Sequence, residues 1–194
     1  MEFCELIIGS MFSGKTSELI RRVKRLILSG RNVVVFQHSI NKRDGSNIET
    51  RDGIRINGII VSSSEEIDLN ISQRLAKNEK IYAVGIDEIQ FFDNGIINVI
   101  KKHNIKNKIK FLIAGIDSDF KGRLFPVFYE LIPYCDSLTK LTSICVVCGS
   151  EYGCRNQRVR DNSPVIDGEI IECDSGTNYQ PRCLKCFVEN MEIN

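Results

Sequence analysis

The sequence lacks an excess of either charge. Its 26 Lys and Arg residues against 25 Asp and Glu residues give a formal net charge of +1 at pH 7. A chain with this balance exerts no overall attraction on nucleic acid or on an anionic membrane surface. We therefore expect neither nucleic acid nor a membrane as a partner.

Long apolar runs are also missing. No segment approaches the length of about 18 apolar residues that indicates a transmembrane helix. The first five residues carry neither the basic region nor the apolar run of an export signal, and the chain has no internal repeat or low-complexity segment. These absences predict a cytoplasmic protein. A length of 194 residues with 42% hydrophobic content is sufficient for one globular domain and a small appendage.

Apolar segments that alternate with amphipathic ones indicate the fold class. Strands are expected over 3–8, 32–37, 54–61, 81–86 and 109–116, and helices over 16–29, from about 62, and over 94–103. This alternation predicts an α/β fold with a mostly parallel sheet covered on both faces. After Leu141 the composition changes to cysteines and short strand-like runs. We therefore predict a nucleotide-binding α/β domain over 1–141 and a small domain over 142–194, with a mobile loop over 38–53 and a disordered tail over 188–194.

A glycine-rich turn follows the first expected strand and opens the first expected helix. It consists of Gly9, Ser10, Met11, Phe12, Ser13, Gly14, Lys15 and Thr16. Glycines let backbone N–H groups curl around an anion, and the helix start adds its positive dipole end. In this pattern Lys15 reaches the β- and γ-phosphates of a nucleoside triphosphate, and the Thr16 hydroxyl ligates Mg²⁺. The alternative is an ordinary strand–helix turn with a surface lysine.

Two carboxylates follow the strand expected over 81–86. An acid at this place downstream of a phosphate loop holds the hydration shell of Mg²⁺, and Asp87 is assigned that role. Glu88 is then free to accept a proton from an attacking hydroxyl in a kinase, or to polarise water in an ATPase. Right-handed crossovers place both acids on the sheet edge that carries the phosphate loop. The alternative is a pair of solvated acids at a strand end.

Four of the eight cysteines form two pairs of equal spacing. They are Cys145 and Cys148, and Cys183 and Cys186. A gap of two residues turns two thiolates toward one centre, so two such pairs predict a tetrahedral structural Zn²⁺ site. Redox-active or disulfide-bonded pairs are the alternative. The remaining cysteines are expected to be buried free thiols: Cys4, Cys135, Cys154 and Cys173. Of these, Cys154 and Cys173 are candidates for an additional or substitute zinc ligand.

Taken together, these motifs resemble those of the cellular (type II) thymidine kinases. The resemblance is carried by the phosphate loop, the Asp-Glu-Ile-Gln-Phe-Phe motif at 87–92, the loop over 115–122, residues 139–141 before the first cysteine pair, and Tyr179 before the second. It extends from about residue 3 to 187. Several independent motifs in the same order are far more specific than any one alone.

The resemblance implies ATP-dependent, Mg²⁺-dependent phosphorylation of the 5′-hydroxyl of thymidine, and also of deoxyuridine. It implies a RecA-like P-loop domain, a zinc-ribbon-like domain that carries a loop closing over the nucleoside, a homotetramer, and feedback inhibition by thymidine triphosphate. Glu88 would be the general base, and Gln90 would support loop geometry. The implied substrate-binding residues are Met11, Phe91, Ile116, Phe120, Asn156, Ile171, Glu172, Cys173, Asp174 and Tyr179. The first four of these would line the apolar side of the thymine pocket, although phenylalanines at such positions are also common in cores.

The sequence departs from the family pattern at several positions. Asn41 stands in place of an aspartate and Arg51 in place of a histidine, while Arg43 occupies the position of an arginine of the flexible loop. Asn156 stands where a threonine-containing run lies near the thymine methyl group, and an amide there would favour deoxyuridine. An alternative function is that of an ATP-driven nucleic-acid-binding protein with a zinc ribbon. The near-neutral charge and the absence of a basic stripe argue against it.

Overall fold

The structure is a computed structural model that describes residues 4–40, 47–49, 53–161, 163–172 and 178–192. Contacts divide the chain into two compact units. The sheet unit comprises Met1–Ile7, Lys15–Gly115 and Pro126–Thr139, and the cysteine unit comprises Ile8–Gly14, Ile116–Phe125 and Lys140–Asn194. The chain therefore enters the cysteine unit at three separate places along the sequence. The predicted division at residue 141 remains a proposal about where an independently folding domain begins.

Six strands form the main sheet. Their order is β5 (Ile59–Val61), β2 (Val33–His38), β6 (Ala83–Asp87), β7 (Lys110–Ile116), β1 (Cys4–Gly9) and β8 (Ser137–Leu141). β2 pairs in parallel with both β5 and β6, and β6 pairs in parallel with β7. All five residues of β6 are buried, as expected for a central strand with helices on both faces. The predicted α/β class with a mostly parallel sheet is confirmed.

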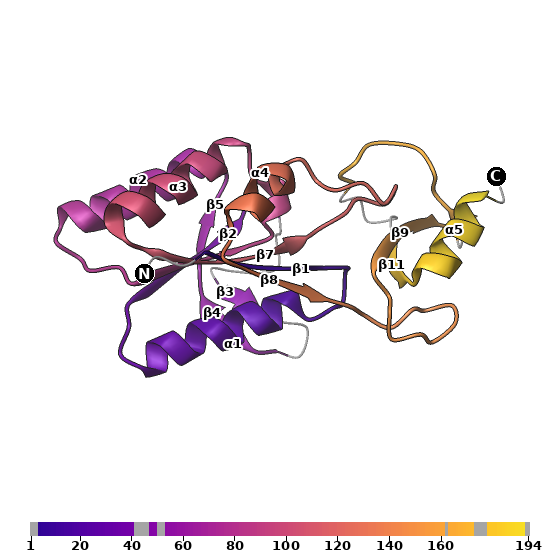
Figure 1. The fold of residues 1–194 in the computed structure, drawn as a ribbon, viewed down its shortest axis with the longest axis horizontal. Coiled ribbons are helices and arrows are strands. Elements are labelled where there is room, and N and C mark those ends of the chain that lie inside the picture. Colours follow the sequence, from indigo (N-terminus) through magenta and orange to yellow (C-terminus); the bar gives the residue numbers. More distant parts are fainter. Residues whose placement is uncertain (1–3, 41–46, 50–52, 162, 173–177, 193–194) are drawn as a thin grey trace. The chain divides into compact units, whose positions relative to one another are not determined.

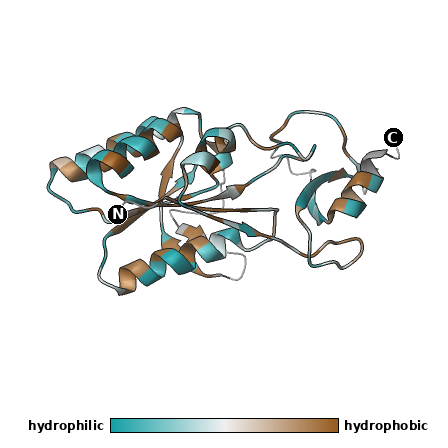
Figure 2. Cartoon of the chain, in the orientation of Figure 1, coloured by the Kyte–Doolittle hydropathy of each residue, from teal (hydrophilic) through white to brown (hydrophobic). Residues whose placement is uncertain are grey.

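Helices cover both faces of this sheet. α1 (Lys15–Leu28) lies on one face, and α2 (Ser64–Ala76), α3 (Gly95–Asn107) and α4 (Val127–Tyr134) lie on the other (Figure 1). α1 packs against β2 and β6 and buries Leu19, Ile20 and Val23. These residues recur at helical spacing, so they form one apolar stripe on the buried face of the helix. Figure 2 shows that α1 also carries hydrophilic residues along its length. The serine cap predicted for the second helix is present, because the Ser63 side chain accepts a hydrogen bond from the Glu66 N–H.

One predicted strand was wrong in its extent. Residues 54–61 form two strands: β4 (Arg55–Asn57) pairs antiparallel with β3 (Asn47–Glu49), whereas β5 joins the main sheet. Gly58 separates them. A Cβ atom at this glycine would lie 2.7 Å from Cγ1 of Ile48, so the chain can change sheets here only without a side chain. β3 also lies within the segment predicted to be a loop, and α4 and β8 were not predicted.

The cysteine unit has a small sheet of its own. β9 (Arg155–Arg160) pairs antiparallel with β10 (Ser163–Pro164) and with β11 (Asn178–Arg182). α5 (Leu184–Glu192) packs against β9 and β11. The disorder predicted over 188–194 was therefore wrong as far as Glu192, because this helix continues to that residue. Among the described residues, no helix is both long enough and apolar enough to span a bilayer.

Candidate active site

The first part of the phosphate loop belongs to the cysteine unit. Gly9 has φ +151°, and a Cβ atom there would lie 2.3 Å from the carbonyl oxygen of Leu141, so only glycine fits. Gly14 also has a positive φ, of +82°. The Ser10 hydroxyl donates to the Gly153 carbonyl at 2.6 Å, and the Met11 N–H donates to Oδ1 of Asn156 at 2.7 Å. These two hydrogen bonds attach the loop to Gly153, which precedes β9, and to Asn156 of β9 itself.

The second part of the phosphate loop belongs to the sheet unit. Lys15 begins α1 and is 8% exposed. The Thr16 hydroxyl donates to Oδ2 of Asp87 at 3.0 Å, so the end of β6 and the start of α1 meet at one point. Burial and then the charge of Glu88 raise the pKa of Asp87, to about 7, against the hydrogen bond from Thr16 and the charge of Lys15. A hydroxyl and a carboxylate together are the oxygen ligands that Mg²⁺ prefers.

Glu88 sits in an uncommon backbone conformation. Its φ of 54° and ψ of 48° are left-handed, a region that residues other than glycine rarely adopt and that clusters at functional sites. The side chain accepts a hydrogen bond of 2.6 Å from Nε2 of Gln90, which is buried. A Cβ atom at Gly115 of β7 would lie 2.7 Å from Oε1 of this glutamine. The glycine therefore allows the turn η1 (Ile89–Phe91) to approach β7 and to orient the Glu88 carboxylate.

The predicted substrate residues divide between the two units. Phe91 lies half-buried in the sheet unit, where its ring centroid is 6.1 Å from that of His38. Phe92 packs edge-on against the same histidine and is buried, as a core residue is. In the cysteine unit Phe120 is fully buried, and Ile171 is exposed.

Two buried polar side chains connect the predicted substrate residues of the cysteine unit. Asn156 links Met11 to the loop over 115–122, because its Nδ2 donates to the Ser118 carbonyl at 2.9 Å. Both ends of this amide are therefore used by the backbone. Arg158, which sequence reasoning did not select, contacts Phe120, Tyr179 and Glu172. No local pattern indicates it, because these partners are far apart in the chain.

Several predicted residues lie outside the part of the chain that the structure describes. They are Cys173 and Asp174 of the closing loop, and Asn41, Arg43 and Arg51 of the earlier polar segment. Their roles stay predictions.

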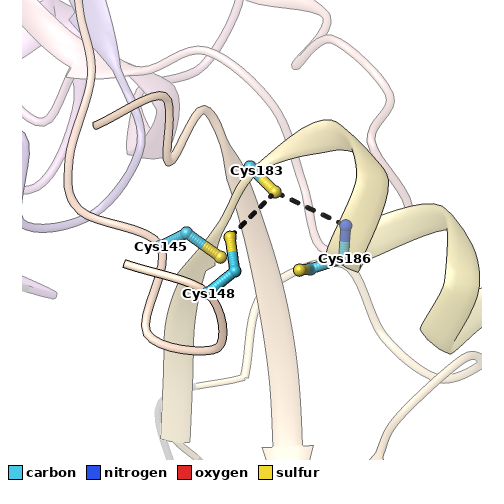
Figure 3. A group of neighbouring side chains, drawn as sticks. All are labelled: Cys145, Cys148, Cys183 and Cys186. Carbon is cyan, nitrogen blue, oxygen red and sulfur yellow. Dashed lines mark hydrogen bonds between the residues drawn. The ribbon is translucent and has the colours of Figure 1, made fainter. Parts of the chain in front are cut away.

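The four paired cysteines form one cluster. The Sγ atoms of Cys145, Cys148, Cys183 and Cys186 all lie within 4.8 Å of one another, and Figure 3 shows them pointing toward a common centre. Those of Cys148 and Cys183 are 3.7 Å apart. A tetrahedron of thiolates with zinc–sulfur bonds of about 2.3 Å has sulfur–sulfur distances of about 3.8 Å. The cluster therefore has the donor set and the spacing that suit a structural zinc ion, and each described cysteine is a free thiol.

A parallel α/β sheet with a buried lysine, a hydroxyl and a carboxylate at one strand end is the arrangement expected of an enzyme that acts on phosphorylated ligands. Comparison with known proteins defines the family. The thymidine kinase family model matches residues 2–187. A curated thymidine kinase of Mycoplasma capricolum subsp. capricolum (strain California kid) is 36% identical over 190 residues, which cover 97% of this chain and 90% of that protein. The chain belongs to the thymidine kinase family.

Proposed function

We propose that the protein transfers the γ-phosphoryl group of ATP to the 5′-hydroxyl of thymidine, and also of deoxyuridine, and so forms the nucleoside monophosphate. Family membership supports this activity. The observation that carries it is the meeting of Thr16 with Asp87, with Glu88 next in the chain and oriented by Gln90. A phosphate-binding helix start and a directed carboxylate are the two elements that phosphoryl transfer to an alcohol requires.

In the proposed mechanism, Glu88 accepts the proton of the 5′-hydroxyl. The alcohol oxygen then forms a bond to the γ-phosphorus, the bond from this phosphorus to the bridging oxygen breaks, and ADP leaves. Lys15 neutralises charge on the β- and γ-phosphates. Mg²⁺ would be held by Thr16, and by Asp87 through water, and would supply further neutralisation of the phosphates.

The nucleoside site is proposed to use the side chains predicted from the sequence. In the cysteine unit, Met11, Ile116 and Phe120 would line the thymine pocket. The role of Phe91 stays a prediction from the sequence. The loop from Ile171 to Tyr179 would close over the nucleoside. Support comes from the cysteine unit itself, where Asn156 holds the backbone of Met11, and Arg158 holds Phe120 and Tyr179.

The cysteine cluster is proposed to hold a structural Zn²⁺. Four thiolates leave no open coordination position, so the ion would stabilise the unit and take no part in chemistry. A homotetramer, inhibition by thymidine triphosphate and a cytoplasmic location belong to the same proposal, and family membership is their support. Light scattering and inhibition measured at varied ATP concentrations test the first two.

A panel of nucleosides incubated with γ-labelled ATP tests the proposed function. Label should appear in the monophosphates of thymidine and deoxyuridine, and to a much smaller extent in those of cytidine or purine nucleosides. ATP hydrolysis that is stimulated by polynucleotide, without labelled nucleoside, would instead support the nucleic-acid-dependent ATPase that we considered as an alternative.

A further inference from the structure

Arg158 is the largest fully buried side chain of the molecule's described part, with 0% exposure. A buried guanidinium is costly unless all of it is paired. β9 buries two further polar side chains beside it, Asn156 and Gln157, but neither carries a charge, and the proposed phosphoryl transfer does not use Arg158. The residues that surround it are the ones proposed to hold the nucleoside.

The register of the small sheet places Arg158 directly opposite Tyr179. Nε and Nη2 of the arginine both donate to the Tyr179 hydroxyl oxygen, at 3.0 and 2.8 Å. This hydroxyl in turn donates to the Glu172 carbonyl at 3.4 Å. The hydroxyl thus donates one hydrogen bond and accepts two, which uses its full capacity. The tyrosine therefore presents its ring, and not its hydroxyl, to any ligand.

The same guanidinium also holds the residues that lead into the predicted closing loop, which runs from Ile171 to Tyr179. Nη2 donates to the carbonyl oxygens of Glu169 and Ile170, at 2.6 and 3.1 Å. Nη1 forms an ion pair of 3.1 Å with the Glu172 carboxylate. Its planar face lies over the Phe120 ring, with Cζ 3.8 Å from the ring centroid. A lysine could not make these contacts together, because it lacks both the fork of donors and the flat face.

We propose that Arg158 is a positioning residue for nucleoside binding, which fixes the rings of Phe120 and Tyr179 and the loop over 169–172 as one preformed surface. This proposal rests on the proposed function. The arginine acts through these neighbours and has no part in phosphoryl transfer. Its removal should therefore weaken the binding of nucleoside and leave KM for ATP nearly unchanged.

Arg160 offers a matched control on the same strand. It lies two residues further along β9, so its side chain points to the same face as that of Arg158, and it also pairs with Glu172. It is, however, 56% exposed, and no ring contact is found for it among the described residues. Arg160→Met removes the same charge and one contact to the same glutamate without disturbing the aromatic residues.

The test compares Arg158→Met, Arg158→Lys, Tyr179→Phe and Arg160→Met with the wild type. Thymidine affinity is measured by calorimetry, and KM for both substrates and kcat by steady-state kinetics. Arg158→Met should raise the thymidine Kd about 10- to 100-fold, the effect expected when charge-assisted hydrogen bonds are lost. Arg158→Lys should raise it less, and KM for ATP should change less than about twofold in either variant. Arg160→Met should behave like the wild type.

A double-mutant cycle separates positioning from general destabilisation. Tyr179→Phe removes only the hydroxyl that Arg158 holds, so its effect and that of Arg158→Lys on thymidine affinity should be strongly non-additive. Strict additivity, equal losses for ATP and thymidine, or an Arg160→Met effect as large as that of Arg158→Met would each overturn the proposal. If Arg158→Met fails to fold, Arg158→Lys and Tyr179→Phe decide the question.

The nucleoside panel is run first with the wild type, which keeps the two proposals distinguishable. If the wild type phosphorylates a different nucleoside instead of thymidine or deoxyuridine, the proposed substrate is wrong. The same double-mutant cycle is then measured with that nucleoside. If the wild type binds thymidine and the cycle is additive, only the role of Arg158 fails.

Discussion

The two units are stabilised in different ways. The interior of the sheet unit is mostly apolar, with isoleucines, valines and phenylalanines contributed by β6, β7 and the helices that cover them. The interior of the cysteine unit instead holds Asn156, Gln157 and Arg158 in a row on β9, together with the cysteine cluster. Apolar burial is non-directional and tolerates exchange of similar volumes. A buried polar network depends on each partner, so the cysteine unit should be the more fragile of the two.

Removal of metal should have the largest effect and should be confined to the cysteine unit. Chelation, or Cys183→Ser, is expected to abolish nucleoside binding, because zinc contributes about 10–16 kcal/mol to the folding of small thiolate sites. ATP binding should weaken less, since Lys15 and Thr16 belong to the sheet unit. It should still weaken to some extent, since Ser10 and Met11 belong to the cysteine unit and bond to it. Calorimetry with both ligands measures this difference.

Cys135→Ser is the control for metal removal, because this thiol lies in the sheet unit outside the cluster. Its zinc content and nucleoside affinity should equal those of the wild type. Full nucleoside affinity in metal-free protein would show that the cluster does not support the nucleoside site.

Substitution of Glu88 should have the next largest effect, on turnover alone. Glu88→Gln keeps the shape of the side chain but removes the base, so kcat should fall by about 10²- to 10⁴-fold while both substrates still bind. The exposed Glu65→Gln on α2 serves as the control. An unchanged kcat in Glu88→Gln would remove this residue from the mechanism.

Two buried asparagines test the comparison between the units directly. In the sheet unit, Asn104 donates to the Ile109 carbonyl and accepts from the Tyr134 hydroxyl. In the cysteine unit, Asn156 bridges Met11 and Ser118. Each alanine variant should lose about 1–3 kcal/mol of stability, because buried partners are left unpaired. Only Asn156→Ala should also raise KM for ATP, because it releases the phosphate loop; an equal rise in Asn104→Ala would contradict this.

The smallest predicted effect is a gain in stability from Asp87→Asn. Burial raises the pKa of Asp87 to about 7 in the folded protein, above the ordinary value of 3.8. The folded state therefore binds more protons than the unfolded state between these values, and stability falls as the pH rises from about 4 to 7. Without nucleotide and metal, Asp87→Asn should unfold about 2–4 °C above the wild type at pH 8, the change produced by roughly 1 kcal/mol.

The gain from Asp87→Asn should vanish near pH 3, where the aspartate is mostly protonated in both states. Thermal unfolding at the two pH values measures the difference. A gain that is the same at both values would mean that the carboxylate charge is not its cause.

Local patterns predicted much of the sheet unit because its elements follow short-range rules. The apolar stripe of α1, the serine cap of α2 and the buried run of β6 are each visible within a few residues. The same rules failed at Gly58, where the contact that divides the predicted strand comes from Ile48, in another strand. They also gave no sign of α4 or β8. The roles of individual site residues stay predictions.

The sequence by itself determined the spacing of the cysteine pairs, the alternation of helices and strands that indicates a mostly parallel sheet, and the glycine-rich turn before α1, because each depends on neighbours in the chain. Only the tertiary structure decided the close approach of Gln90 to Gly115, and the burial of Arg158 against Phe120 and Tyr179. Those contacts depend on strand register and on chain segments far apart in sequence, which no local pattern encodes.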